Sequence, residues 1–82
     1  MRTADTIREH VIRAHIMPAR ARGDSTVTII AGDIHSEMNL KRRLPAVCCA
    51  LGSVKFEELA EVERMSLEGP ILGSSTTFTF KL

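Results

Sequence analysis

The sequence predicts one small α+β domain, and three observations lead to that class. Apolar residues recur at helical spacing near the N-terminus, a β-branched run occupies residues 26–30, and residues 76–82 alternate between polar and apolar side chains. A chain of 82 residues supports one compact core, and a hydrophobic content of 44% is enough to build it. We therefore expect a single domain over residues 1–82.

The first predicted helix runs from about Ala4 to Met17. Ile7, Val11 and Ala14 fall on one stripe of that helix, which is the pattern of an element with one buried face. Pro18 is expected to end the helix, because proline lacks the backbone N–H and its ring crowds the preceding turn.

A short strand and two short helices are predicted for the middle of the chain. The strand is expected at Thr26–Ile30 because these residues are β-branched throughout. The second helix is expected at Asp33–Met38, with Asn39 in the left-handed conformation just beyond its end. The third helix begins at Pro45, since proline suits the first helical position, and breaks or ends near Gly52.

The C-terminal third is predicted to form an antiparallel β-hairpin. A further helical turn is possible around Val54–Leu59, after which the sequence becomes extended from about Glu61. The final strand, Thr76–Leu82, carries the clearest alternation in the chain and is expected to pair with the extended segment. Apolar side chains of both strands are expected to face the core, namely Val62, Met65 and Leu67 on one and Phe78, Phe80 and Leu82 on the other.

Residues 32–51 resemble the paired helices of the winged helix-turn-helix family. The resemblance is carried by Ile34, Met38, Leu40, Val47 and Leu51 in the apolar positions, and by the element order helix–short strand–helix–helix–strand–strand. It implies a DNA-binding module of the transcription-regulator type, with the third helix as recognition helix and the C-terminal hairpin as the wing. The resemblance covers essentially the whole chain.

The charges are unevenly distributed, although the net charge is only +1. Residues 41–56 carry basic side chains without an acid, whereas residues 57–68 are strongly acidic. A basic triplet directly before the recognition helix suits contact with DNA phosphates. Six residues are candidates for DNA contact. Lys41, Arg42 and Arg43 come first, Arg20 and Arg22 help if their loop lies alongside, and Ser53 joins Arg42 and Arg43 as a side chain that could reach base edges.

The remaining features weaken sequence-specific recognition of DNA. Residues 44–51 contain none of the polar side chains that read base edges, and the loop at 69–75 has no Lys or Arg. Two interpretations stay open. The domain binds double-stranded DNA mainly through phosphates, or it contacts a protein partner or a second copy of itself through an apolar face that includes Ala46, Cys49 and Ile71.

Catalysis, cofactors and metal binding are not expected. Cys48 and Cys49 are adjacent, so we expect two reduced thiols, with Cys48 the more protected. His10, His15 and His35 are scattered and show no paired spacing of the zinc-finger type. No pair of residues resembles an acid/base or nucleophile couple in a cleft.

The expected location is the cytoplasm, with no membrane association. Charged residues interrupt any apolar signal segment near the N-terminus, and no stretch approaches the roughly 20 apolar residues that span a bilayer.

Overall fold

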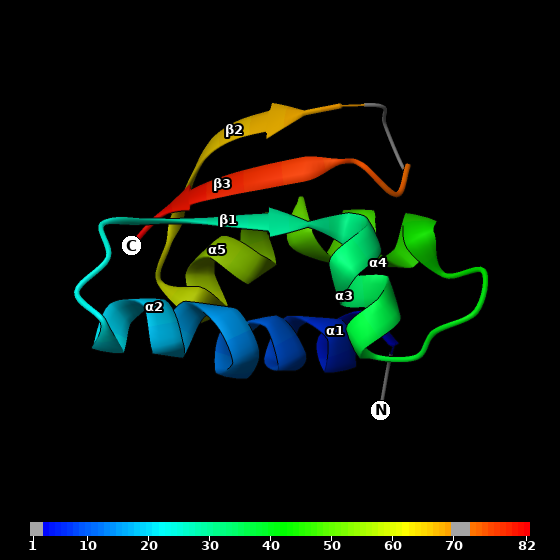
Figure 1. The fold of residues 1–82 in the computed structure, drawn as a ribbon, viewed down its shortest axis with the longest axis horizontal. Helices are drawn as coiled ribbons and strands as arrows, with labels where there is room; N and C mark the ends of the chain where they lie inside the picture. Colours follow the sequence, from blue (N-terminus) through cyan, green and yellow to red (C-terminus); the bar gives the residue numbers. More distant parts are fainter. Residues whose placement is uncertain (1–2, 70–72) are drawn as a thin grey trace.

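The computed structural model describes residues 3–69 and 73–82, which form an α+β domain of two layers. A three-stranded antiparallel sheet covers a layer of helices, as Figure 1 shows. The strands are β1 (Thr26–Ile30), β2 (Glu63–Glu68) and β3 (Thr77–Lys81). Their order in the sheet is β1-β3-β2, so the last strand of the chain is the central one. The element order and the C-terminal hairpin confirm the predicted fold class.

One unbroken helical segment runs along the side of the domain opposite the sheet (Figure 1). The segment extends from Thr3 to Ala21 and so continues through Pro18. The prediction that the helix ends at Pro18 is wrong. A π-helical turn precedes the proline, in which the amide of Met17 donates to the carbonyl of Ile12 five residues back. This wider turn gives the proline ring room and lets the helix continue. The three parts are α1 (Thr3–Val11), η1 (Ile12–Ile16) and α2 (Met17–Ala21).

The middle of the chain follows the prediction closely. Strand β1 (Thr26–Ile30) runs directly into α3 (Ala31–Glu37), whose first two amides donate to carbonyl oxygens of the loop before the last strand. Asn39 has the expected left-handed conformation, with φ of 53°. Helix α4 (Leu44–Leu51) begins one residue before Pro45, and the possible helical turn after it is a complete helix, α5 (Val54–Ala60).

The C-terminal hairpin consists of β2 (Glu63–Glu68) and β3 (Thr77–Lys81). The two strands pair antiparallel, as predicted, and β3 also pairs with β1. Phe78 and Phe80 are buried on the helix-facing side of the central strand, which confirms their assignment. The loop that the sequence predicts as a wing falls partly at residues 70–72, outside the described residues.

Of the three side chains predicted to be buried in this segment, only Val62, which precedes β2, is buried. Val62 is 8% exposed, but Met65 and Leu67 are 57% and 49% exposed. The pairing register shifts between Arg64 and Ser66, so Met65 has no partner on β3. Leu67 shares a face with Phe78, yet β2 is the strand farthest from the helical layer in Figure 1, and the helices leave Leu67 exposed.

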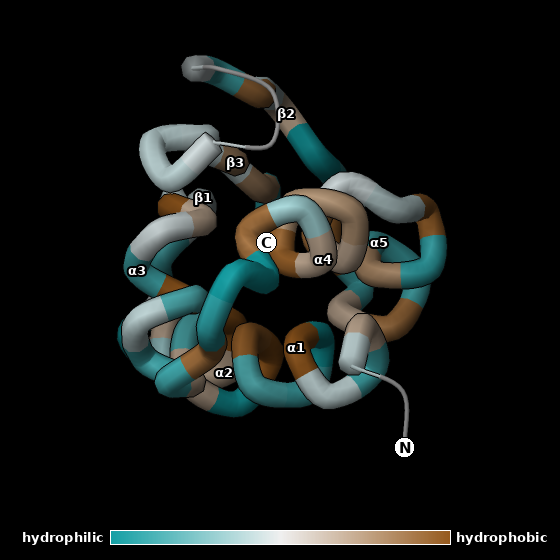
Figure 2. The backbone as a smooth tube through the Cα atoms, turned by 90° about the vertical axis from the view of Figure 1, so that its right-hand side faces the viewer, coloured by the Kyte–Doolittle hydropathy of each residue, from teal (hydrophilic) through white to brown (hydrophobic). Residues whose placement is uncertain are grey.

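The core joins the sheet to the helices through aliphatic side chains and three phenylalanines. The ring of Phe56 lies 5.1 Å from that of Phe80, centroid to centroid, and Phe78 stacks beside Phe80. Figure 2 shows α4 as a largely hydrophobic helix within this arrangement. Cys48 is buried and Cys49 exposed, which confirms the expected difference in protection. Among the described residues, none of the helices has the length and apolar character to cross a membrane.

Candidate functional site

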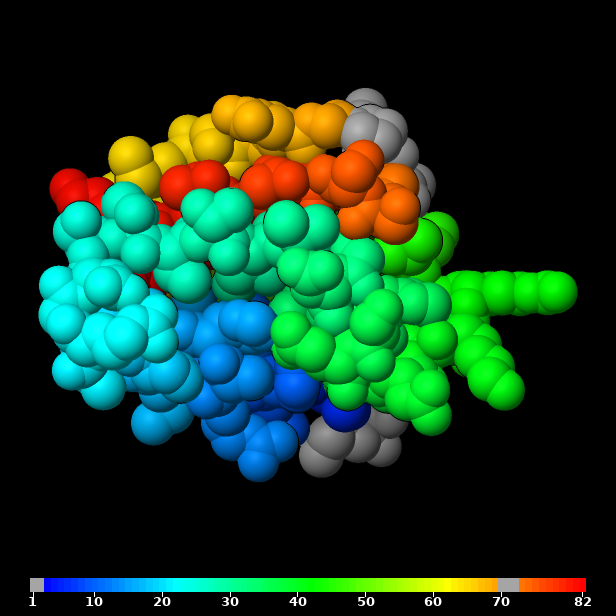
Figure 3. Space-filling model, in the orientation of Figure 1, coloured from blue at the N-terminus to red at the C-terminus, as the bar shows by residue number. Residues whose placement is uncertain are grey.

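The basic turn, residues Lys41–Arg43, joins α3 to α4 at one end of the molecule. All three residues are exposed, and Figure 3 shows side chains of this green segment extending beyond the rest of the surface. No ion pair or side-chain hydrogen bond joins the three cationic groups to any part of the chain that the structure describes. The turn therefore presents three positive charges that remain available to an anionic partner.

The turn projects because the chain is fixed on both sides of it. The amide of Leu40 donates to the carbonyl of His35 at 3.0 Å, and the Leu40 side chain is half-buried against the core. The amide of Arg43 donates to Nε2 of His35 at 3.1 Å. Arg42 has a φ of 54°, in the left-handed region, and lies in a bend of the chain between these two anchors. The side chains of the turn are thereby directed away from the body.

Helix α4 offers little beyond its first turn for recognition of bases. No side chain caps its N-terminus, and Pro45 in the first turn has no N–H. The exposed positions of the helix are Pro45 and Cys49, neither of which carries strong hydrogen-bonding groups for base edges. The exposed face of α4 therefore lacks side chains that read bases, as the sequence indicates.

Arg20 and Arg22 do not lie alongside the basic turn. They sit at the end of α2, and Figure 1 places that end opposite the α3–α4 connection along the longest axis, which measures 34 Å. Arg20 donates to the backbone carbonyl of Glu61, and Arg22 pairs with Asp24 at 2.9 Å. These two arginines were expected to contribute to DNA binding only if they lay beside the basic turn, and they do not.

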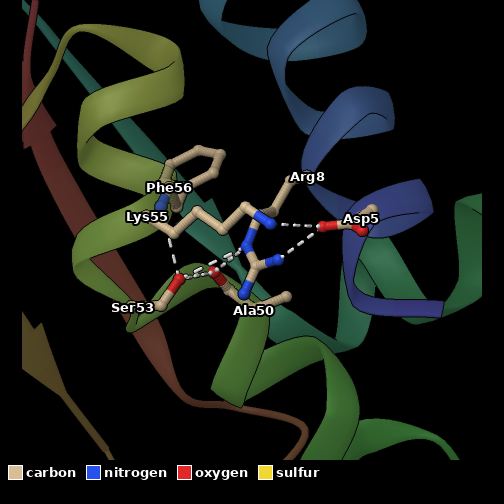
Figure 4. Close-up of polar contacts among 6 residues, drawn as sticks. All are labelled: Asp5, Arg8, Ala50, Ser53, Lys55 and Phe56. Carbon is tan, nitrogen blue, oxygen red and sulfur yellow. Dashed lines mark hydrogen bonds and ion pairs between the residues drawn. The ribbon is translucent and has the colours of Figure 1, made fainter. Parts of the chain in front are cut away.

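Ser53 has a structural role at the start of α5. Its hydroxyl donates to the carbonyl of Ala50 at 2.8 Å and accepts from the amide of Phe56 at 3.3 Å. The guanidinium of Arg8 adds a third contact, with Nε 3.3 Å from the hydroxyl (Figure 4). The hydroxyl is fully committed within the fold, and it lies half-buried between α4 and α5.

A second polar cluster, which the sequence analysis missed, joins His10 and His15 to Glu37. The Nε2 atoms of both histidines lie 2.8 Å from the same carboxylate oxygen, Oε1 of Glu37. Burial raises the pKa of this carboxyl, but the hydrogen bonds and charges of the two histidines outweigh burial and hold the pKa below its ordinary value. The sequence carries no local signal for this cluster, because residues five apart lie on different faces of a regular α-helix.

Fold and geometry together define a small α+β domain, compatible with a winged helix, that carries a projecting basic turn. Comparison of the chain with protein-family models, curated proteins and solved structures found no match.

Proposed function

We propose that this domain is a winged-helix-like module that binds double-stranded DNA through phosphate contacts of the basic turn. The observation that carries the proposal is the exposure of Lys41, Arg42 and Arg43 without any described acidic partner. A cation already paired within the protein must give up that partner to bind a phosphate, whereas these three have no partner among the described residues to give up. The fold places them directly before the helix that the winged-helix resemblance assigns to the DNA.

Affinity in this proposal is electrostatic, and sequence preference is weak. Each neutralised phosphate releases condensed counterions, which makes affinity fall as salt rises. The exposed positions of α4 provide no donors or acceptors for the major-groove edges of bases, so the protein holds the backbone and reads little sequence. A module of this kind suits a larger DNA-acting assembly or a transcription regulator whose specificity comes from elsewhere.

A salt series tests the proposal directly. The affinity for a random-sequence duplex is measured by fluorescence anisotropy at several salt concentrations. With three phosphates neutralised, log affinity is expected to fall against log salt with a slope of about −2.7. Replacing all three residues of the turn with alanine should flatten the slope almost to zero.

A variant with the same loss of charge elsewhere serves as the control. Alanine at Arg13, Arg20 and Arg22 removes three cations that lie on η1, on α2 and just after α2. This variant should keep most of the wild-type slope, because these arginines lie outside the basic turn. Equal losses in the two triple variants would show a response to net charge alone and would contradict a site at the turn.

A protein partner is the second candidate, favoured by exposed apolar side chains on α5 and β2. Val54 and Leu59 on α5 are 66% and 55% exposed, and Met65 and Leu67 on β2 are comparably exposed. A contiguous apolar patch at the surface typically marks a contact site for proteins, so this candidate requires these side chains to form one surface. This candidate predicts no duplex binding near 0.1 M salt. Of the apolar face expected from the sequence, Cys49 is exposed, Ala46 is half-buried and Ile71 lies outside the described residues.

A further inference from the structure

The cluster of His10, His15 and Glu37 brings three metal-binding side chains to one place from three elements. His10 lies on α1 and His15 on η1, while Glu37 is the last residue of α3. One ligand atom from each side chain lies within 4.8 Å of the other two. The histidine side chains are 26% and 27% exposed and the glutamate 36%, so an ion can reach the cluster from solvent.

The π-helical turn contributes to this convergence. On a regular α-helix, residues five apart point about 140° away from each other around the axis. Segment η1 widens the helix between Val11 and Met17, and His15 lies within it. The two imidazoles then lie with ring centroids 6.2 Å apart and both reach the same carboxylate. π-turns of this kind frequently occur at functional sites.

We propose that His10, His15 and Glu37 form a binding site for a divalent transition-metal ion of the zinc type. Two imidazole nitrogens and one carboxylate oxygen are the donors that such ions take, and three protein ligands with water in the fourth position make a complete tetrahedral shell. The ion bridges the N-terminal helix to the end of α3, from which Met38, Asn39 and Leu40 lead to the basic turn.

The spacing of the donors fits an ion after a small adjustment. Tetrahedral bonds of about 2.0–2.1 Å place neighbouring donors about 3.3 Å apart. Each histidine Nε2 lies 2.8 Å from the Glu37 oxygen, so this oxygen moves about half an ångström away from each ring when a tetrahedral ion binds. The three donor atoms lie within 4.8 Å of one another, so any wider pair closes by at most about 1.5 Å. Partly exposed side chains on the outside of two helices have room for this movement.

The protonation of the histidines provides a specific signature of binding. A carboxylate accepts hydrogen bonds and cannot donate them, so both Nε2 atoms carry the proton when they contact Glu37 without metal. A metal ion needs the lone pair of Nε2, and the remaining ring proton then resides on Nδ1. Binding therefore changes the state of Nε2 in these two rings.

Imidazole ¹⁵N NMR of the full chain, titrated with Zn²⁺ alone, tests the proposal. The Nε2 resonances of His10 and His15 should shift together and saturate at one ion per chain. His35 is an internal control, because its Nε2 accepts from the amide of Arg43 and is outside the cluster. The titration is repeated in Cys49→Ser, since the exposed Cys49 thiol is itself able to bind zinc.

Variants separate the cluster from scattered surface binding. His15→Gln and Glu37→Gln should each weaken Zn²⁺ affinity at least about tenfold, as measured by isothermal titration calorimetry. Mutating a group that only orients a metal ligand already costs about tenfold or more in affinity, and losing the ligand itself should cost no less. Glu9→Gln, an exposed carboxylate on α1, should leave affinity unchanged. A similar response of all three histidines, no response of His10 and His15, or binding that disappears with Cys49 would each overturn the proposal.

Discussion

Arg8 and Ser53 are 45 residues apart in the chain and are joined by a hydrogen bond of 3.3 Å from Nε to the hydroxyl. The same Nε lies 3.3 Å from the carbonyl of Ala50, and the other side of the guanidinium pairs with Asp5 at 2.9 Å (Figure 4). The Arg8 side chain is only 11% exposed. The Arg8 side chain therefore links α1 to the junction between α4 and α5.

Replacing Arg8 with alanine should destabilise the domain by about 2 kcal/mol, because charged hydrogen bonds and packing of the aliphatic stem are lost together. That loss lowers the melting temperature by about 10 °C in a domain of this size, as measured by circular dichroism. Arg13→Ala, at an exposed position on η1, is the control and should change stability by less than about 0.5 kcal/mol. Equal melting temperatures for the two variants would show that the Arg8 contacts contribute nothing.

The stability contributed by Asp5 should depend on pH. The hydrogen bond from Lys55, together with the charges of Lys55 and Arg8, holds the pKa of the Asp5 carboxyl below its ordinary value. A carboxyl with a lowered pKa in the folded state stabilises the fold above its unfolded-state pKa, and that contribution is lost as the pH falls through the folded-state pKa. Urea unfolding should show wild type more stable than Asp5→Asn at neutral pH. The difference should shrink in acid, and a constant difference across this range would contradict the assignment.

Replacing Gly32 with alanine should destabilise the domain, even though Gly32 lies in a helix. Alanine favours helices by about 1 kcal/mol over glycine, so propensity alone predicts stabilisation. A Cβ at this position, however, meets the backbone oxygen of Ser74 at 2.6 Å, against which α3 is held by the hydrogen bond from the Gly32 amide. We expect Gly32→Ala to destabilise by about 1–3 kcal/mol in chemical denaturation. Ser36→Ala, on the exposed side of α3, is the matched control, and a stabilised Gly32→Ala would refute the close approach.

The two cysteines should react at very different rates. Cys49 is exposed, whereas Cys48 is 6% exposed and its sulfur faces the carbonyl of Gly73 at 3.9 Å. One thiol per chain should therefore be modified quickly in the native protein and both in denaturant. The Cys49→Ser variant should react only at the slow rate that opening of the fold permits. Rapid modification of that variant would remove Cys48 from the core.

The sequence predicted the elements whose pattern is local. The alternation around Phe78 and Phe80 and the β-branched run of β1 follow from side-chain period alone, and both strands formed where they were expected. The helix through Pro18 was not predictable in this way, because the rule that proline ends a helix assumes α-helical geometry. A single π-turn removes the conflict and leaves no clear mark in composition.

The missed features depend on how distant segments meet. Nothing near His10 or His15 indicates that Glu37 lies beside them, since the contact requires both the π-turn and the packing of α3 against the N-terminal helix. The wrong burial of Met65 has a similar origin, because a register shift is a property of two paired strands. The basic turn was accessible to sequence analysis because its three cations are consecutive, whereas the distance of Arg20 and Arg22 from it was not.

The most direct test of DNA binding at the basic turn is an NMR titration of ¹⁵N-labelled protein with a random-sequence duplex at low salt. We predict that amide shifts change at Lys41–Arg43 and at the start of α4, and that added salt reverses these changes. We expect little change at Arg20 and Arg22, at the far end of the molecule (Figure 1). Shifts confined to the exposed apolar residues of α5 and β2, or no shifts at the turn, would contradict the proposed function.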